Sequence, residues 1–200
     1  MLGLPASTEI RKVITKKKVY EQFGSEMSTE RRKSFDADIV RITLVNEVSP
    51  TSVNIPEGEN VKSFFVILIA LRKKEYDKQN IAFIAKMFGQ KLLVVLEYEG
   101  MHSLAIWQTR LIQQDWTLPE NVHVELAGLD LDKVWENIVA GTAGVEITPG
   151  QSLDKQLAAQ QKRQKLEKEI SKLEKLAWIE KQPKRKMEFV KKIAELKTEL

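Results

Sequence analysis

Short apolar runs and longer stretches with helical spacing alternate along the first three quarters of the chain. Phe64–Leu71 is apolar at every position, the pattern of a central strand that is covered on both faces. Leu92–Tyr98 and Leu104–Trp107 are joined through Glu99-Gly100, and we expect a β-hairpin there. The remaining predicted strands are Ile39–Val45 and Val122–Leu126.

Apolar residues recur every three or four positions between these runs. Tyr76–Phe88 has this helical spacing, and Gly89 stands where a helix stop belongs. In Gly128–Asp132 an aspartate is placed to cap a second helix. We expect this helix to end at Gly141 and Gly144.

The N-terminal stretch predicts helices as well. Ser7–Phe23 opens with a plausible cap and predicts one or two short helices, and Met27–Lys33 predicts the start of another. Residues 1–150 are therefore expected to form an α+β body. Its sheet should be mixed, mainly antiparallel, with four or five strands and flanking helices.

The end of the chain has a different pattern. From Ser152 onward it contains no glycine and one proline, Pro183, which can break a helix and begin the next one. We predict an antiparallel helical hairpin, a coiled coil, over residues 151–200, separated from the body at Thr148–Gly150. The seam positions step by three and four: Leu166, Ile170, Leu173 and Ala177, then Phe189, Ile193, Leu196 and Leu200.

The two arms of this hairpin differ in length. Ser152–Lys181 would form about 45 Å of helix and Lys184–Leu200 about 25 Å at the usual rise per residue. The base of the longer arm then has no partner within the hairpin. We expect Leu153 and Leu157 to dock on the body or on a second subunit.

Charge divides the chain at the same place. Residues 151–200 contain 14 Lys/Arg and 8 Asp/Glu, a net charge of +6, whereas residues 1–150 contain 18 and 20, a net charge of −2. A basic tail on a nearly neutral body favours a polyanionic partner, of which nucleic acid is the first candidate.

Composition excludes several classes of protein. The chain contains no cysteine, so disulfides, thiolate metal sites and cysteine nucleophiles are excluded, which fits a cytoplasmic setting. Met1–Ile10 lacks the features of a signal peptide. The longest apolar run, Phe64–Leu71, is too short to span a bilayer, so we expect a soluble protein and no membrane partner.

Cations and one aromatic residue meet at the predicted tip of the hairpin. Such a group can contact phosphates and stack on a base, so it predicts a nucleic-acid site. The alternative is a solvated loop in which Trp178 packs over Pro183 and Met187. The tip residues are Trp178, Lys181, Lys184, Arg185 and Lys186. A second basic group has the same two interpretations: Arg11, Lys12, Lys16, Lys17 and Lys18.

The sequence shows no catalytic motif. Without a Walker loop, dinucleotide fingerprint, nucleophile elbow or metal-binding helix motif, we expect no cofactor, no metal and no catalytic residue. A nuclease of the common restriction type needs an acid-x-Lys triplet on a strand, and Leu71 stands where the acid before Lys73 would be. A divergent metal-dependent nuclease using Asp36, Asp38 or Glu47 stays an alternative.

Several stretches together carry a family resemblance: Ile14–Tyr20, Val48–Ile55, Phe64–Leu71, Gly128–Asn137 and the charged C-terminal helices. They resemble a bacterial family known as domain of unknown function 4391, and the resemblance covers nearly the whole chain. It implies no activity or catalytic residue that can be transferred. It does imply an accessory role around DNA, because such proteins tend to be encoded near DNA methyltransferases and helicases in restriction or phage-defence regions.

Three functional hypotheses follow. The first is a non-enzymatic accessory subunit of a bacterial DNA-processing or phage-defence assembly. It would present the basic tip to nucleic acid and dock on protein partners such as helicase or methyltransferase subunits. The second is a protein-interaction module whose hairpin pairs with a partner helix or with a second copy in a homodimer. The third is the divergent nuclease.

Overall fold

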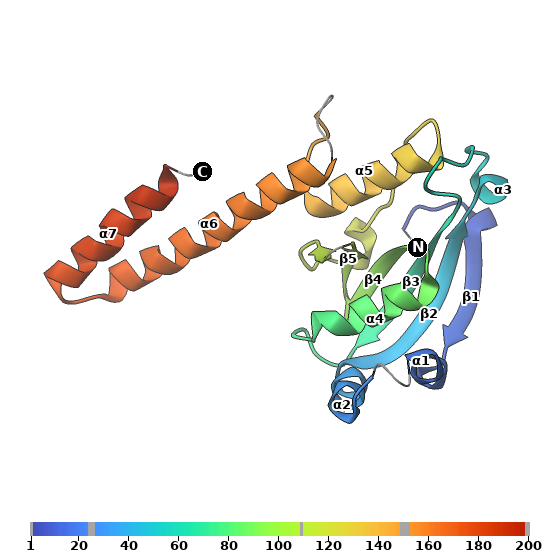
Figure 1. Ribbon diagram of the computed structural model, residues 1–200, viewed down its shortest axis with the longest axis horizontal. Helices are drawn as coiled ribbons and strands as arrows, with labels where there is room; N and C mark the ends of the chain where they lie inside the picture. The colour runs from blue at the N-terminus through green and yellow to red at the C-terminus, as the bar shows by residue number, and fades with distance from the viewer. Residues whose placement is uncertain (1, 24–26, 109, 149–152, 199–200) are drawn as a thin grey trace. The chain divides into compact units, whose positions relative to one another are not determined.

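The computed structural model describes residues 2–23, 27–108, 110–148 and 153–198. The chain divides into two compact units, Met1–Glu146 and Ile147–Leu200. The first unit is a mixed α/β body, and the second contains two long helices (Figure 1). Pro149 and Gly150, predicted as part of the junction, lie outside the described residues.

In the described part of the chain, six strands form one sheet: β1 (Glu9–Ile14), β2 (Ile39–Val48), β3 (Phe64–Leu71), β4 (Lys91–Tyr98), β5 (Met101–Trp107) and β6 (Leu111–Gln113). They lie in chain order. Strands β3 and β4 are parallel, and the other neighbouring pairs are antiparallel. Parallel neighbours need a crossover, which here is helix α4 (Lys78–Phe88). The predicted mixed, mainly antiparallel sheet is confirmed.

Strand β3 lies at the centre of the body, between β2 and β4. Its side chains Phe64 and Ile67 are both fully buried, as predicted for a strand covered on two faces. Phe64 and Phe65 point to opposite faces because side chains alternate along a strand. The Phe65 ring lies 5.5 Å from that of Phe88 in α4. The Phe64 ring lies 5.3 Å from that of Trp135 in α5 (Leu131–Ala143), so these two helices cover opposite faces.

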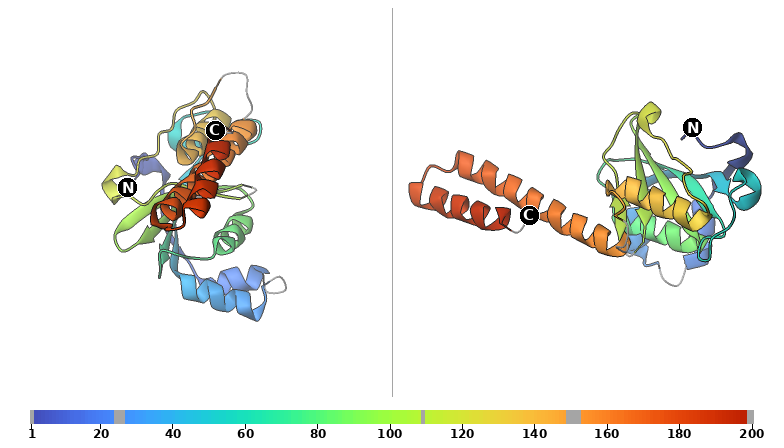
Figure 2. Two further views of the ribbon diagram at one scale, coloured as in Figure 1. Left: turned by 90° about the vertical axis from the view of Figure 1, so that its left-hand side faces the viewer. Right: turned by 90° about the horizontal axis from the view of Figure 1, so that it is seen from above.

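Helices α1 (Lys16–Phe23) and α2 (Thr29–Asp38) lie on the same face as α4. Val19, Phe35 and Ile81, one from each helix, share a core cluster with Ile67 and Ile69 of β3. Figure 2 shows α1 and α2 side by side at one end of the body. Three helices thus bury one face of the sheet.

Helix ends lie where the sequence predicts them. Asp77 and Asp130 each accept a hydrogen bond from the first turn of α4 and α5, at 2.9 Å in both cases. Gly89 and Gly144 end the same helices with φ angles of 60° and 65°, which side chains disfavour. Gly141, predicted as part of the second stop, lies inside α5.

The helix predicted over Ser7–Phe23 is correct only in its second half. Its first half contains a single 3-10 turn, Ala6–Thr8, and then β1, an edge strand of the sheet that pairs with β2. The basic residues Arg11 and Lys12 of β1 are exposed. The unpaired edge of β2 supplies backbone partners that outweigh the local helical pattern.

The strand predicted at Val122–Leu126 is wrong. This segment follows a second 3-10 turn, Pro119–Asn121, and the backbone N–H of Val124 donates to the carbonyl of Leu2 at 2.9 Å. Val122 and Val124 are buried. Their alternation with polar residues therefore reflects packing of an irregular segment and not membership of the sheet.

The second unit contains α6 (Leu153–Ile179) and α7 (Pro183–Lys197), packed as a hairpin. The predicted seam is confirmed except at Leu166, which is half-buried and not part of the core cluster, and Leu200, which lies outside the described residues. Ion pairs join Lys192 to Glu169 at 3.1 Å and Lys197 to Glu174 at 2.9 Å. No helix in the described residues is long and apolar enough to cross a membrane. The buried seam residues are Ile170, Leu173, Ala177 and Ile193, with Phe189 and Leu196 against them.

The loop between the short helix α3 (Pro50–Val53) and β3 docks on the start of α5. The Asp132 carboxylate accepts the backbone N–H groups of Asn60 at 3.1 Å and Val61 at 2.7 Å. Burial raises the pKa of Asp132, but these hydrogen bonds outweigh burial and hold that pKa below its usual range. Gly58 is buried in this contact. A Cβ atom at Gly58 would overlap the carboxylate and the backbone nitrogen of Asp132.

Replacing Gly58 with alanine should lower the free energy of unfolding by about 1–3 kcal/mol, because the added methyl group pushes the loop away from α5. Gly141→Ala is the matched control. Its Cβ would meet open space inside α5, so this change should raise stability by about 0.5–1 kcal/mol. Urea unfolding followed by circular dichroism measures both. A Gly58→Ala protein as stable as the parent would show that the close contact is absent.

Candidate nucleic-acid interface

The hairpin tip comprises residues 178–187, where α6 ends and α7 begins. The Glu180 carboxylate accepts the backbone N–H of Gln182 at 2.9 Å and closes the turn. Pro183 then begins α7, since a proline needs no N–H partner in a first helical turn. The first backbone hydrogen bond of α7 runs from the N–H of Lys186 to the carbonyl of Gln182, at 3.0 Å.

The tip brings the five predicted residues into one short stretch of surface. The Trp178 side chain is 86% exposed and Met187 is 73% exposed, so the alternative in which Trp178 packs over Pro183 and Met187 does not occur. The four cations at positions 181, 184, 185 and 186 are exposed, and within the described residues none of them forms an ion pair. An open indole beside unpaired cations can stack on a base while the cations contact phosphates.

A feature that the sequence reasoning missed lies on the outer face of α7. Met187 and Val190 are 73% and 51% exposed, and together with Pro183 and Ala194 they line a shallow apolar groove of about 680 Å³. These positions recur at intervals of four, three and four residues. That spacing, beside the seam pattern, could have identified a second apolar face on the helix.

The residues predicted to dock the base of the long arm are not open to solvent. Leu157 is buried, at 6% exposure, and Leu153 is half-buried. Neighbouring Gln156 exchanges hydrogen bonds with the backbone of Thr148, at 3.1 and 3.2 Å. Docking of Leu153 and Leu157 on a partner stays a prediction.

The second predicted basic group is divided between two elements. Arg11 and Lys12 lie on β1, whereas Lys16, Lys17 and Lys18 form the first turn of α1. The structure therefore does not present these five residues as one helical patch.

Asp36 in α2 ties the start of α1 to the rest of the body. Its carboxylate accepts hydrogen bonds from Lys16 at 3.0 Å and from the Tyr20 hydroxyl at 2.7 Å. Burial raises the pKa of Asp36, but the hydrogen bonds from Tyr20 and Lys16 outweigh burial and lower it. Burial and the same hydrogen bond raise the pKa of Tyr20. The Arg72 guanidinium also donates to the backbone carbonyl of Asp36, at 3.2 Å.

Asp38 is one of the three acids of the nuclease hypothesis, and it contacts Lys73, the lysine of the incomplete acid-x-Lys triplet. Its side chain is 2% exposed, and one oxygen lies 2.9 Å from the Lys73 ammonium. The other accepts the backbone N–H of Asp77 and the amide of Asn80, both at 2.8 Å. Asp38 thus fastens the end of β3 and the start of α4 to the start of β2.

The other acids of the nuclease hypothesis do not gather around Asp38. Leu71 is buried at the end of β3, opposite Ile39. Glu47 lies at the other end of β2, opposite Phe65. Across the residues that the structure describes, no three His, Asp or Glu side chains are grouped so as to hold a metal ion.

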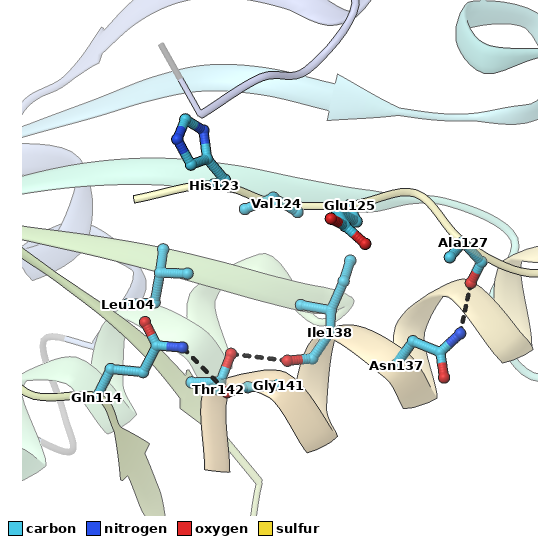
Figure 3. Close-up of a pocket in the computed structure, with 10 residues that line it drawn as sticks. All are labelled: Leu104, Gln114, His123, Val124, Glu125, Ala127, Asn137, Ile138, Gly141 and Thr142. Atoms are coloured by element: carbon cyan, nitrogen blue, oxygen red, sulfur yellow. Dashed lines mark hydrogen bonds between the residues drawn. The ribbon is translucent and has the colours of Figure 1, made fainter. Parts of the chain in front are cut away.

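A cavity of about 330 Å³ lies between α5, β5 and the segment after the second 3-10 turn (Figure 3). Three of its polar side chains are engaged in internal hydrogen bonds. Gln114 donates to Gly141 at 3.0 Å, and Asn137 donates to Ala127 at 2.6 Å. The Thr142 hydroxyl donates to the carbonyl of Ile138, one turn earlier in α5, at 2.7 Å. These groups fasten the loop to α5 and do not point to a particular ligand.

Residues 2–200 match the family described as Domain of unknown function (DUF4391). The chain belongs to this family. No curated protein and no solved structure matches the chain. Membership therefore confirms the family resemblance and supplies no activity.

In this DUF4391 chain, one of the stretches that carry the resemblance within the body is the central strand β3, and the others lie at turns and helix ends. Ser49 and Ser52 form a capping box at the start of α3. Lys16 pairs with Asp36, and Asp132 holds the loop before β3. Folding accounts for these residues. The exposed tip belongs to the remaining stretch, the charged C-terminal helices.

Replacing Asp38 with alanine should lower the free energy of unfolding by about 3 kcal/mol, because Asn80 and the Asp77 N–H lose a buried partner. Lys73→Met is the comparison and should lower it by less than Asp38→Ala does, because the buried Asp38 carboxylate loses its cation but keeps the hydrogen bonds from Asp77 and Asn80. Urea unfolding is measured with and without Mg²⁺. Mg²⁺ stabilisation of the parent that disappears in Asp38→Ala would instead assign Asp38 to a metal site.

Proposed function

We propose that this DUF4391 protein is a non-enzymatic accessory subunit of a bacterial DNA-processing or phage-defence assembly, and that its hairpin tip binds single-stranded nucleic acid. The observation that carries the proposal is the 86% exposure of Trp178 next to four cations of the tip. None of these cations forms an ion pair within the described residues. Leaving an indole in water is unfavourable, and a base stacked on the ring would remove that surface from water.

The chemistry of the tip favours an unpaired strand over a duplex. A single indole can stack on one base face, which a duplex keeps inside its own stack, and this contact is worth about 1–3 kcal/mol per base. The four cations add phosphate contacts that carry no sequence information. Binding should therefore be sensitive to salt and tolerant of sequence.

Changing Lys181, Lys184, Arg185 and Lys186 together to Gln should weaken binding to a fluorescein-labelled single-stranded DNA or RNA. Because four phosphate contacts are lost, the slope of log K against log salt should fall by about 3. Glutamine keeps the helix propensity of lysine. Fluorescence anisotropy over a salt series measures the slope.

The matched control changes four exposed lysines of α6 to Gln: Lys165, Lys168, Lys172 and Lys175. It removes the same charge from the hairpin away from the tip, so it should leave most of the affinity and slope. Trp178→Ala should weaken binding roughly 5- to 150-fold with the slope unchanged. A tip variant that binds like the parent, or a control that loses as much, would contradict the proposal.

The groove on α7 supports a second candidate function, binding of a partner helix. Met187, Val190 and Ala194 present about two turns of apolar surface. Lys184, Lys191 and Glu188 also line the groove, so cations outnumber acids there, and both lysines are without an ion pair among the described residues. We propose that an amphipathic helix with acidic edges fits this groove. A second copy of the hairpin fits less well, because it would bring its own unpaired cations against these lysines.

Changing Val190 and Ala194 to Glu should remove such a partner and leave nucleic-acid binding in place, because both residues line the groove and lie outside the tip. Affinity purification of the parent and of this variant from the native host, with protein and nucleic acid both identified, tests this. Gln164→Glu with Ser171→Glu adds two carboxylates at exposed positions of α6 as a control. At high salt, the partner should stay bound to the parent and to the control and should be lost from the groove variant. The same proteins recovered with all three would exclude the groove.

A further inference from the structure

Charge is unevenly distributed over the body. Its basic end consists of α1, α2 and residues 72–78, which precede and begin α4. These three segments contain 10 Lys/Arg and 6 Asp/Glu, whereas the rest of residues 1–150 contains 8 and 14. A net charge of +4 thus lies on one end of a body whose remainder carries −6. Such a separation produces a positive potential that attracts polyanions.

Hydrogen bonds and ion pairs join the three segments into one surface. Asp36 of α2 binds Lys16 of α1 at 3.0 Å, and its backbone carbonyl binds Arg72 at 3.2 Å. Asp38 binds Lys73 at 2.9 Å. Strand register explains the meeting, because the end of β3 lies opposite the start of β2 and the end of β1 lies close by. Figure 1 shows α1 and α2 at this end of the sheet.

The acids of the basic end are largely occupied. Asp36, Asp38 and Asp77 pair with Lys16, Lys73 and Arg31, and Glu21 lies 3.7 Å from Lys17. Exposed cations remain that have no acidic partner within the described residues: Lys18, Lys33, Lys74 and Lys78. The internal pairs therefore position the surface and leave these four ammonium groups for an external anion.

Several of these cations stand where they oppose helix stability. Lys16, Lys17 and Lys18 fill the first turn of α1, and Lys78 is the first residue of α4. Helix α1 has no acidic residue in its first turn, whereas the Asp77 carboxylate caps α4 next to Lys78. The positive end of a helix dipole disfavours cations. Folding alone therefore does not account for the three lysines at the start of α1, where a phosphate would interact favourably with both the lysines and the helix end.

We propose that the basic end is a second phosphate-binding surface of the protein, which holds the backbone of the nucleic acid. The choice of ligand rests on the proposed function. Its four free lysines come from α1, α2, the β3–α4 connection and α4, so they are spread over several elements, as suits a chain of phosphates. Tyr20, an aromatic residue among them, is half-buried and its hydroxyl is engaged by Asp36. The basic end is thus suited to contact phosphates and not bases.

The test changes Lys18, Lys33, Lys74 and Lys78 together to Gln in the full chain. Binding to labelled single-stranded DNA should weaken about tenfold or more, with a fall of about 3 in the slope of log K against log salt. The free energy of unfolding should stay equal or rise, since Lys18 leaves the start of α1, where the helix dipole disfavours a cation. Anisotropy titrations and urea unfolding give the two readouts.

The matched control removes four cations from elsewhere on the body: Lys62, Lys86, Lys91 and Lys133. Lys62 and Lys133 form ion pairs and Lys86 lies in the last turn of α4, so this control should lose stability and keep affinity. The tip variant is measured alongside. Loss of affinity in the basic-end variant alone would support this inference and reject the tip proposal. Loss in the tip variant alone would reject this inference and support the tip. Unchanged affinity in both would reject both.

Discussion

A strand that is apolar at every position cannot face water on either side, and Phe64–Leu71 is such a strand. Helix α4 covers one face and α5 the other, and α4 is also the crossover that makes β4 a parallel neighbour of β3. The same arrangement brings the end of β3 to the start of β2. Asp38 locks that junction through Lys73 and Asn80. The basic segments that follow β1 and β3 therefore meet at one end of the body.

Folding explains most of the large side chains. The body exposes Leu129 and Val13, and the hairpin exposes Trp178, Ile179, Met187 and Val190. Trp135 is 5% exposed against the sheet, whereas Trp178 is 86% exposed. The hairpin uses one apolar face for its seam and leaves Met187 and Val190 of α7 open. Two of its lysines are held in ion pairs between the helices, while those of the tip are unpaired among the described residues. Exposed aromatic and apolar groups beside free cations favour a binding role.

The parts of the fold and of the candidate site that could be predicted are those determined by residues close together in sequence. The apolar composition of Phe64–Leu71 predicts a buried strand, and the residues of the tip follow one another along the chain. Strand β1 was not predictable, because the edge of β2 that captures it is distant in sequence. Val122–Leu126 alternates like a strand but packs as an irregular segment. The basic end could not be predicted either, since tertiary contacts assemble Lys18, Lys33 and Lys74 from separate elements.

Photo-crosslinking tests the central claim, base contact at the hairpin tip, most directly. The full chain is irradiated in complex with single-stranded DNA that carries 5-iodouracil, and the modified residue is identified by peptide mass spectrometry. An indole stacked on the base should place the main crosslink at Trp178. The lysines of the basic end should lie along the phosphates and give little base crosslinking. Crosslinks confined to the body, with Trp178 unmodified, would contradict the claim.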